Sequence, residues 1–409
     1  MESIPYTILH LNIRTTVKNT MKERTMKGKK AVIRVIVGLA VFFVLAGAAI
    51  YAGLRIKMKE KQPEAVHEGI AVVILDSGSY YYSDEGIDKG MKLAMEELEK
   101  ESGLKVSVKR VDDDGDYVKG IALAESLAKD PEVDIVISFQ NFESIGPEMP
   151  FFEEAGKPFI VTMGCYDEVA EQEYDYFVAD FLSGKAIGRR IGRYLLENGA
   201  SNIALCHSDT TFEQDEIRGL QAVVGDDEKT KVVYTQTGPF QDEELAGLLW
   251  KCDQLQVDTV VANFYDQEDC AWLLGQLGQK SKGLMLVGDY ALDSEGILKE
   301  YGSNLENVTI IPSYPYLMTE ELAQFINRYE EYAKTGFTTA AVQYYDLFKM
   351  LGKYWQKTGN DSQALMKQIK DPAGYRGVSG SIRFDENGCL TVKECPVYEC
   401  HNGEFIPKE

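Results

Sequence analysis

From residue 69 onward, apolar runs of strand length alternate with segments of helical spacing. Residues 69–78 form an apolar run that ends in turn residues, which predicts a buried strand. Residues 84–101 place apolar side chains three and four positions apart, which predicts a helix with one buried face. The order repeats, with strands expected at 105–111, 133–138 and 158–162 and helices at 117–129 and 144–155. This alternation predicts an α/β fold with a parallel sheet and right-handed crossovers.

The alternation restarts after residue 183. A helix is expected at 183–198, and it ends at Gly199, a residue typical of helix C-termini. A second series of strands is expected at 202–208, 231–236, 258–264, 283–289 and 308–314, with helices between them. Helices at 319–334 and 340–358 and strands within 378–400 complete the chain. The sequence therefore predicts two doubly wound parallel-sheet lobes in succession.

A different pattern precedes the lobes. Residues 35–54 are 20 consecutive uncharged, mostly apolar residues, the length of one bilayer span. Eight basic residues precede this run and four follow it closely, so residues 1–34 are expected in the cytoplasm and residues 62–409 outside, after a linker at 55–68. We expect an uncleaved, single-pass anchor in the cell membrane. The alternative is a signal peptide cleaved near residues 46–48, and Met1, Met21 and Met26 each remain a candidate start.

Charge and chemistry exclude several classes of protein. Residues 62–409 hold 31 basic and 62 acidic residues, which argues against nucleic-acid binding. The seven cysteines are scattered, and only Cys389, Cys395 and Cys400 lie close enough in sequence to suggest one disulfide in an oxidising compartment. With four histidines and no metal-ligand spacing, neither a metal site nor a cofactor is expected. No nucleophile, phosphate-loop or metalloprotease motif occurs in the sequence, so we do not expect an enzyme.

Aromatic residues follow almost every expected strand. In doubly wound sheets, ligands bind beyond the carboxyl ends of the strands, where rings form the walls of a pocket. Phe139 and Tyr290 stand in such positions. The residues that we predict to contact a ligand on this basis are Tyr80, Tyr81, Tyr82, Phe142, Tyr166, Phe212, Phe264 and Tyr265.

Three stretches of the sequence resemble type I periplasmic (solute) binding proteins, especially the branch that binds branched-chain amino acids. Residues 71–98 are similar to the family's first strand, ligand loop and glycine-marked helix, and residues 181–206 to the helix and strand that open its second lobe. Residues 375–388, with the pattern G-x-x-G-x-x-x-F-D-x-x-G, are similar to a segment near the family's C-terminus and form the most specific match. The resemblance spans residues 69–405.

The resemblance implies two hinged lobes that close on a ligand. One lobe would comprise 69–183 and 318–374, the other 184–314 and 375–409, with crossings near 181–186, 312–318 and 375. It implies a receptor that delivers a small polar ligand, an amino acid or a related molecule, to the permease subunits of an ABC importer. The alternatives are a ligand-sensing module that signals to a separate membrane partner, a sugar or nucleoside receptor of the same fold, and a relative that binds no ligand.

The resemblance also adds candidate site residues. Amino-acid-binding members hold a carboxylate with hydroxyl and backbone N–H groups that follow the third and fourth strands. Asn141 and Ser144 occupy the first of these loops, and Cys165 and Tyr166 the second. The family's acidic partner for the ligand amine maps to Asp289, which follows the strand ending at Gly288.

Overall fold

The computed structural model describes residues 69–78, 85–139, 142–164, 174–281, 283–392 and 395–408. All of these ranges fall in one compact unit formed by residues 65–409. No helix within these ranges is long and apolar enough to cross a bilayer. The apolar run at 35–54 lies outside the described residues.

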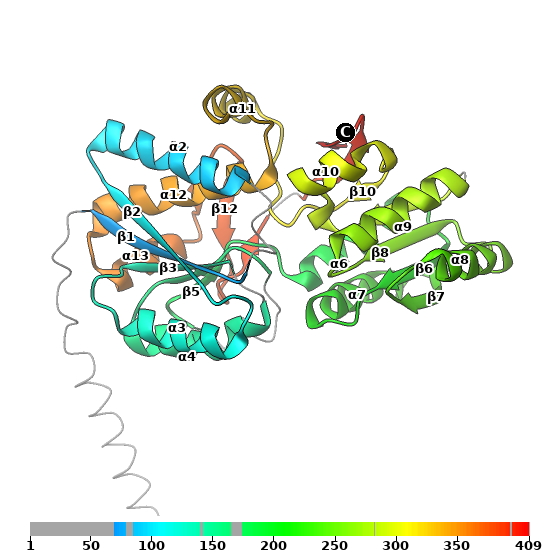
Figure 1. The fold of residues 1–409 in the computed structure, drawn as a ribbon, viewed down its shortest axis with the longest axis horizontal. Coiled ribbons are helices and arrows are strands. Elements are labelled where there is room, and N and C mark those ends of the chain that lie inside the picture. The colour runs from blue at the N-terminus through cyan, green and yellow to red at the C-terminus, as the bar shows by residue number, and fades with distance from the viewer. Residues whose placement is uncertain are drawn as a thin grey trace, which may run out of the picture. The chain divides into compact units, whose positions relative to one another are not determined.

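The first lobe is built on a five-stranded sheet in the order β2-β1-β3-β4-β5, with every strand parallel to its neighbour. Its strands are β1 (Ile70–Asp76), β2 (Val106–Asp112), β3 (Ile135–Phe139), β4 (Phe159–Val161) and β5 (Phe177–Ala179). The central strands are almost wholly apolar because helices cover both faces of the sheet. Helices α2 (Glu85–Ser102) and α12 (Thr339–Thr358) cover one face, and α3 (Tyr117–Lys129) and α4 (Phe142–Ala155) the other (Figure 1). Two further helices, α11 (Glu320–Ala333) and α13 (Ser362–Ile369), pack beside α2 and α12.

The second lobe is built on a seven-stranded sheet in the order β15-β14-β10-β9-β8-β6-β7. Its parallel strands are β6 (Asn202–His207), β7 (Lys231–Thr237), β8 (Thr259–Asn263), β9 (Met285–Gly288) and β10 (Thr309–Ile310). The two C-terminal strands, β14 (Tyr398–His401) and β15 (Glu404–Pro407), extend its edge in antiparallel fashion. The prediction of an α/β fold with two parallel sheets is confirmed.

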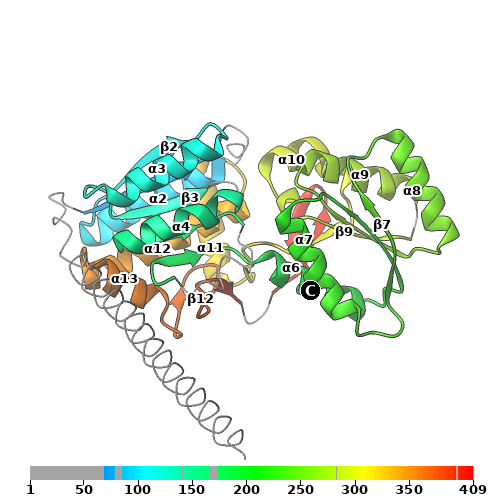
Figure 2. The ribbon, with the colours of Figure 1, turned by 90° about the horizontal axis from the view of Figure 1, so that it is seen from below.

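Helices also enclose the second sheet. α6 (Gly184–Glu197) and α7 (Thr211–Val224) pack together on one face, while α9 (Gln267–Lys280) lies on the other (Figure 2). The remaining helical segments are α8 (Asp242–Gln254), η2 (Tyr290–Leu292), α10 (Glu295–Tyr301) and η3 (Gly302–Asn304). The contact between α6 and α7 is unusually close, since a Cβ built on Gly188 would lie 1.9 Å from the Glu216 carbonyl oxygen.

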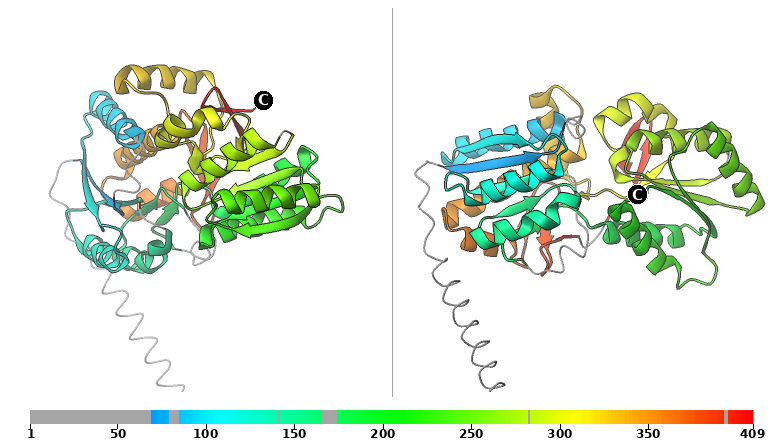
Figure 3. Two further views of the ribbon diagram at one scale, coloured as in Figure 1. Left: turned by 45° about the vertical axis from the view of Figure 1, so that its right-hand side comes forward. Right: turned by 60° about the horizontal axis from the view of Figure 1, so that its bottom comes forward.

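The chain crosses between the lobes after β5, after β10 and after a small C-terminal sheet. That sheet comprises β11 (Tyr375–Arg376), β12 (Ser381–Phe384) and β13 (Leu390–Thr391). Its last turn is tied to the first lobe, because the Ala179 N–H donates to the Gly388 carbonyl over 2.8 Å. Of the described strands after residue 374, β14 and β15 join the second sheet, whereas β11, β12 and β13 do not. The third crossing therefore follows β13 and not residue 375 as the sequence suggested. Figure 3 shows both lobes and this segment.

The cysteines near the C-terminus do not form a disulfide with one another. Cys395 and Cys400 both carry free thiols, so neither is linked to the other or to Cys389. Cys400 is buried, and its sulfur contacts the Gly302 carbonyl oxygen over 3.7 Å.

Candidate functional site

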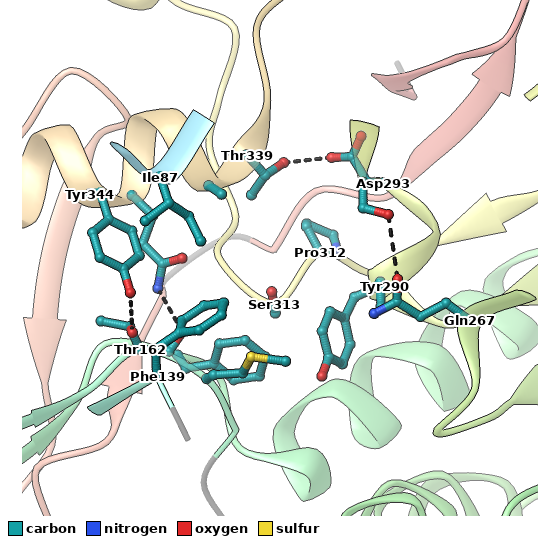
Figure 4. A pocket seen from close by; sticks show the side chains of 16 residues that line it. Ile87, Phe139, Thr162, Gln267, Tyr290, Asp293, Pro312, Ser313, Thr339 and Tyr344 are labelled. Carbon is teal, nitrogen blue, oxygen red and sulfur yellow. Dashed lines mark hydrogen bonds between the residues drawn. The ribbon is translucent and has the colours of Figure 1, made fainter. Parts of the chain in front are cut away.

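A cavity of about 120 Å³ is lined by side chains from both lobes (Figure 4). The first lobe contributes residues of α2, the ends of β3 and β4, and the first turns of α12. The second lobe contributes residues from α9 to α10, and the first two crossings supply the rest. The lining comprises Ile87, Phe139, Thr162, Met163, Thr339, Ala340, Gln343 and Tyr344, then Phe181, Pro312 and Ser313, then Gln267, Tyr290, Ala291, Asp293 and Ser294.

A hydrogen-bonded group fixes the first-lobe wall. Thr162 follows β4, and its hydroxyl donates to the Ser138 carbonyl over 3.2 Å, so it accepts from the Tyr344 hydroxyl over 2.6 Å. The Gln343 amide donates to the backbone carbonyls of Thr162, over 3.3 Å, and of Asp180, over 2.5 Å. Gln343 and Tyr344 are buried, so these bonds hold α12 against the carboxyl ends of β4 and β5.

A direct hydrogen bond joins the two walls of the cavity. The Thr339 hydroxyl, in the first turn of α12, donates to Oδ2 of Asp293 over 2.5 Å (Figure 4). On the second-lobe side, the Ser294 hydroxyl donates to Oε1 of Gln267 over 3.4 Å. The cavity therefore presents one carboxylate together with hydroxyl and amide groups, which can bind a small polar molecule.

Three aromatic rings form a layer beside the cavity. Phe181 lies 5.1 Å from Tyr290 and 6.1 Å from Phe212 between ring centroids, and Phe212 lies 5.9 Å from Tyr290. All three pairs meet edge to face, the geometry that aromatic quadrupoles favour. Phe181 belongs to the first crossing, whereas Phe212 and Tyr290 belong to the second lobe, so this layer joins the crossing to the second-lobe wall.

A group of buried acidic side chains lies in the second lobe at the same end of the strands. Asp289 follows β9, and its Oδ1 accepts from the Ala291 N–H over 2.7 Å, which caps η2. Burial raises the pKa of Asp289 to about 8, the Ala291 hydrogen bond opposes this shift, and the charge of Glu213 adds to it. Burial, followed by the charge of Asp289, raises the pKa of Glu216 well above its usual range, although the Asn263 amide donates to Glu216. In both groups, burial therefore favours the neutral form of the carboxyl group.

The structure places the predicted contact residues in different surroundings. Phe212 contacts the cavity-lining rings Phe181 and Tyr290. Phe264 is buried against Phe240, with ring centroids 5.4 Å apart, and Tyr265 beside it is 37% exposed. Ser144 is buried in α4, and Asp289 is 6% exposed and adjoins the lining residues Tyr290 and Ala291.

The other predicted contact residues are Tyr80, Tyr81, Tyr82, Asn141, Cys165 and Tyr166, and they lie outside the described residues. Phe142 is the first residue of α4, but its side chain also lies outside the described part of the chain. These residues stay predictions.

Sequence reasoning missed the α12 wall. Thr339, Gln343 and Tyr344 do not follow a strand, and the sequence shows only the start of a helix, which Thr338 caps by accepting from the Ala341 N–H. It also passed over Asp293, which lies four residues beyond Asp289. By contrast, Phe139 and Tyr290, which do follow strands, line the cavity.

Among the residues that the structure describes, no three His, Cys, Asp or Glu side chains are placed to hold a metal ion. The Asp112–Asp114 segment forms a hydrogen-bonded turn in which Oδ1 of Asp112 accepts from the N–H groups of Gly78 and Asp114, each over 2.7 Å.

The comparisons with known proteins agree with this architecture. A family model described as a periplasmic binding protein matches residues 69–404. No curated protein sequence matches the chain. Among solved structures, an ABC transporter substrate-binding protein from Desulfitobacterium hafniense in complex with Leu is similar, with 17% identity and a TM-score of 0.71, over 83% of this chain and 100% of that one.

Two further solved structures share the fold. The substrate binding protein LivJ from Streptococcus pneumoniae, in complex with isoleucine, has 16% identity and a TM-score of 0.70, over 83% of this chain and 100% of that one. A solute binding protein from R. palustris, in complex with benzoate, has 18% identity and a TM-score of 0.69, over 83% of this chain and 95% of that one.

Proposed function

Because this chain belongs to the family of periplasmic binding proteins, we propose that it is the extracytoplasmic solute-binding protein of an ABC import system. The observation that carries the proposal is the cavity lined by both lobes, with two crossings between the lobes among its lining segments. A ligand that contacts both walls favours the closed arrangement, because only that arrangement satisfies both sets of contacts. The permease subunits would then recognise the closed, loaded receptor.

We propose a small polar ligand that carries an amine, an amino acid or a related molecule. The cavity offers the Asp293 carboxylate and several hydroxyl groups, and the Phe181–Phe212–Tyr290 layer offers apolar contact beside them. A carboxylate at a partly desolvated site binds an ammonium group with a charge-assisted hydrogen bond. The two leucine- or isoleucine-bound relatives carry ligands of this class, while the benzoate-bound relative shows that the fold also accepts an aromatic acid.

We further propose that residues 35–54 anchor the receptor in the membrane, with residues 1–34 in the cytoplasm and 62–409 outside. The support is the length of the uncharged run and the excess of basic residues before it. Resistance of the protein to alkaline extraction from membranes, together with protease access to residues 62–409 in intact spheroplasts, tests both parts of this proposal.

The ligand is tested by a thermal-shift screen of the full chain in mild detergent against amino acids, short peptides, sugars, nucleosides and polyamines. A ligand at about 100 times its Kd adds about 2.7 kcal/mol to stability, which raises the Tm measurably. A hit among amino acids supports the proposal. A hit confined to sugars or nucleosides refutes the amine ligand and favours a receptor of that class, and no hit favours a sensing module or a relative without ligand.

Two matched substitutions then identify the carboxylate that binds the amine. Asp293→Asn removes the charge that faces the cavity. Asp289→Asn removes the carboxyl group that the sequence predicts to bind the amine, yet keeps a side-chain oxygen that can accept from the Ala291 N–H. We expect the variant at the true partner to bind the amine ligand at least about tenfold more weakly in calorimetry. Unchanged affinity in both variants would show that neither carboxylate contacts the ligand.

A further inference from the structure

A second cavity, which we call the groove, lies along α6. It measures about 460 Å³, and the two cavities share no lining residue. One wall is α6, where Arg189, Arg190 and Arg193 line it. The opposite wall is β13 and the start of the third crossing, including Leu390 and Val392.

The walls of this groove come from different parts of the fold. α6 opens the second lobe, whereas β13 belongs to the small sheet that is tied to β5 of the first lobe through the Ala179–Gly388 hydrogen bond. The groove therefore bridges the first and third crossings. Arg190 already joins its two walls, because its Nε donates to the Cys395 carbonyl over 2.8 Å.

The charge of the groove is opposite to that of the body. Among the described residues that line it, three arginines accompany one acidic residue, Glu197, which pairs with Arg190 over 3.2 Å. Arg189 and Arg193 are exposed, and their guanidinium groups make no hydrogen bond or ion pair to another described residue. Residues 62–409 hold twice as many acidic as basic residues, so carboxylates that could pair with a guanidinium group are abundant. None of the described carboxylates is paired with Arg189 or Arg193.

The spacing of the two arginines defines the ligand that would suit them. Residues four apart on a helix lie on one face, with Cβ atoms about 5–6 Å apart. Each guanidinium binds a carboxylate or phosphate through paired N–H donors. A concave surface lined by one sign of charge also concentrates counter-ions of the other sign. The apolar opposite wall, with Leu390 and Val392, can contact the part of a molecule that joins two anionic groups.

We propose that this groove is a binding site for a small molecule that carries two oxyanion groups, one at Arg189 and one at Arg193. Its occupant would contact α6 of the second lobe and β13, which is tied to the first, at the crossings themselves. Because the occupant contacts both walls, it favours one relative position of the lobes. If a ligand in the central cavity favours the same position, each ligand strengthens the binding of the other. This inference does not depend on the ligand of the central cavity.

The test is isothermal calorimetry of the full chain in mild detergent at fixed ionic strength, with inorganic pyrophosphate and glutarate as the probes. We compare the double variant Arg189→Gln/Arg193→Gln with the control Arg376→Gln/Lys231→Gln. The control removes the same charge from exposed side chains on β11 and β7, outside the groove. We expect wild type and control to bind one probe with similar affinity, and the groove variant to bind it at least about tenfold more weakly.

Each outcome decides the proposal. Binding of pyrophosphate alone, or of glutarate alone, supports it and names phosphate or carboxylate as the anionic group. Absence of binding by wild type up to 10 mM of either probe (roughly the weakest affinity that serves a solute) would overturn it. Equal weakening in the control and groove variants would also overturn it, because the effect would then follow net charge. The variant Arg189→Lys/Arg193→Lys keeps both charges and should retain part of the affinity for the probe. Retained affinity would show that the loss in the glutamine variant comes from lost contacts and not from altered folding.

Discussion

The contact between α6 and α7 gives the sharpest stability prediction, made by changing one glycine. Gly188 lies on the buried face of α6, where the backbone of α7 passes directly over it. A Cβ at this position would lie 1.9 Å from the Glu216 carbonyl oxygen, whereas real Cβ contacts stay beyond 3.0 Å. Gly188→Ala therefore forces the two helices apart by about 1 Å.

The cost follows from the packing that such a shift disturbs. A gap of about 1 Å forfeits roughly a quarter to a half of the dispersion energy of each contact across it. Overpacking of a filled interior costs about 1–3 kcal/mol, and more where backbone must move. Replacing a helical glycine by alanine returns about 1 kcal/mol. We expect Gly188→Ala to lower the free energy of unfolding by about 2 kcal/mol.

A matched control lies on α8. Gly247 is exposed, and a Cβ built on it meets nothing within 4 Å. Gly247→Ala should therefore raise the free energy of unfolding by about 0.5–1 kcal/mol, since only the helix propensity changes. Urea unfolding followed by far-UV circular dichroism measures both variants. A Gly188→Ala variant with a urea midpoint equal to or above that of wild type would refute the close contact.

Two further predictions concern a buried acid and the bond between the walls. Glu148 is fully buried with no hydrogen-bond partner among the described residues, and burial followed by the charge of Asp113 raises its pKa to about 8. The folded state thus holds the proton more tightly than the unfolded state. The free energy of unfolding therefore falls as pH rises from about 4.5 to 8, by at most about 1.4 kcal/mol per pH unit. In Glu148→Gln, urea midpoints should depend less on pH across this window, and a pH profile equal to that of wild type would contradict the raised pKa. Thr339→Val removes the hydrogen bond to Asp293, a charge-assisted bond worth about 1.5–3 kcal/mol that joins the two lobes. Distances between spin labels on the two lobes should therefore shift toward longer values. The control Thr358→Val, at the far end of α12, should leave these distances unchanged.

The fold was largely predictable because it follows from local patterns. Parallel strands buried on both faces appear as uninterrupted apolar runs, and the helices between them show one apolar face. Each element can therefore be recognised from a stretch of about ten to twenty residues. The third crossing was not predictable in this way. The strands at 375–391 are short, and contacts between residues far apart in the sequence assign them to the first lobe. One of these contacts joins Ala179 and Gly388, which are more than 200 residues apart, and another joins Asp346 of α12 to the Val378 and Ser379 N–H groups.

The site was predictable only where it depends on the ends of strands. The expectation that ligands bind beyond the carboxyl ends of the strands pointed to Phe139 and Tyr290, which line the cavity. It also pointed to Phe264, which is buried against Phe240. Neighbouring residues after a strand point in opposite directions, and the sequence does not say which one faces the core. The same expectation could not point to Thr339, because α12 reaches the cavity through tertiary packing and not through a strand that precedes it.

The C-terminal pattern G-x-x-G-x-x-x-F-D-x-x-G, which resembled a known family, has a physical explanation in these contacts. A Cβ on Gly377 would lie within 2.5 Å of both carboxylate oxygens of Asp346, which accept from the N–H groups of Val378 and Ser379 over 2.9 Å. At the other end of the pattern, Gly388 has φ of +81°, and a Cβ there would lie 2.6 Å from the Phe177 carbonyl oxygen.

The pattern therefore holds one segment against the first lobe at two points, α12 and β5. Between these points Phe384 is buried, and Oδ1 of Asp385 closes the turn by accepting from the Asn387 and Cys389 N–H groups over 3.0 and 2.8 Å. Because the segment is fixed at both ends, the chain leaves the first lobe at a defined place and direction before it enters β14. The glycines that made the pattern recognisable are thus the residues that position the third crossing, and with it one wall of the groove beside α6.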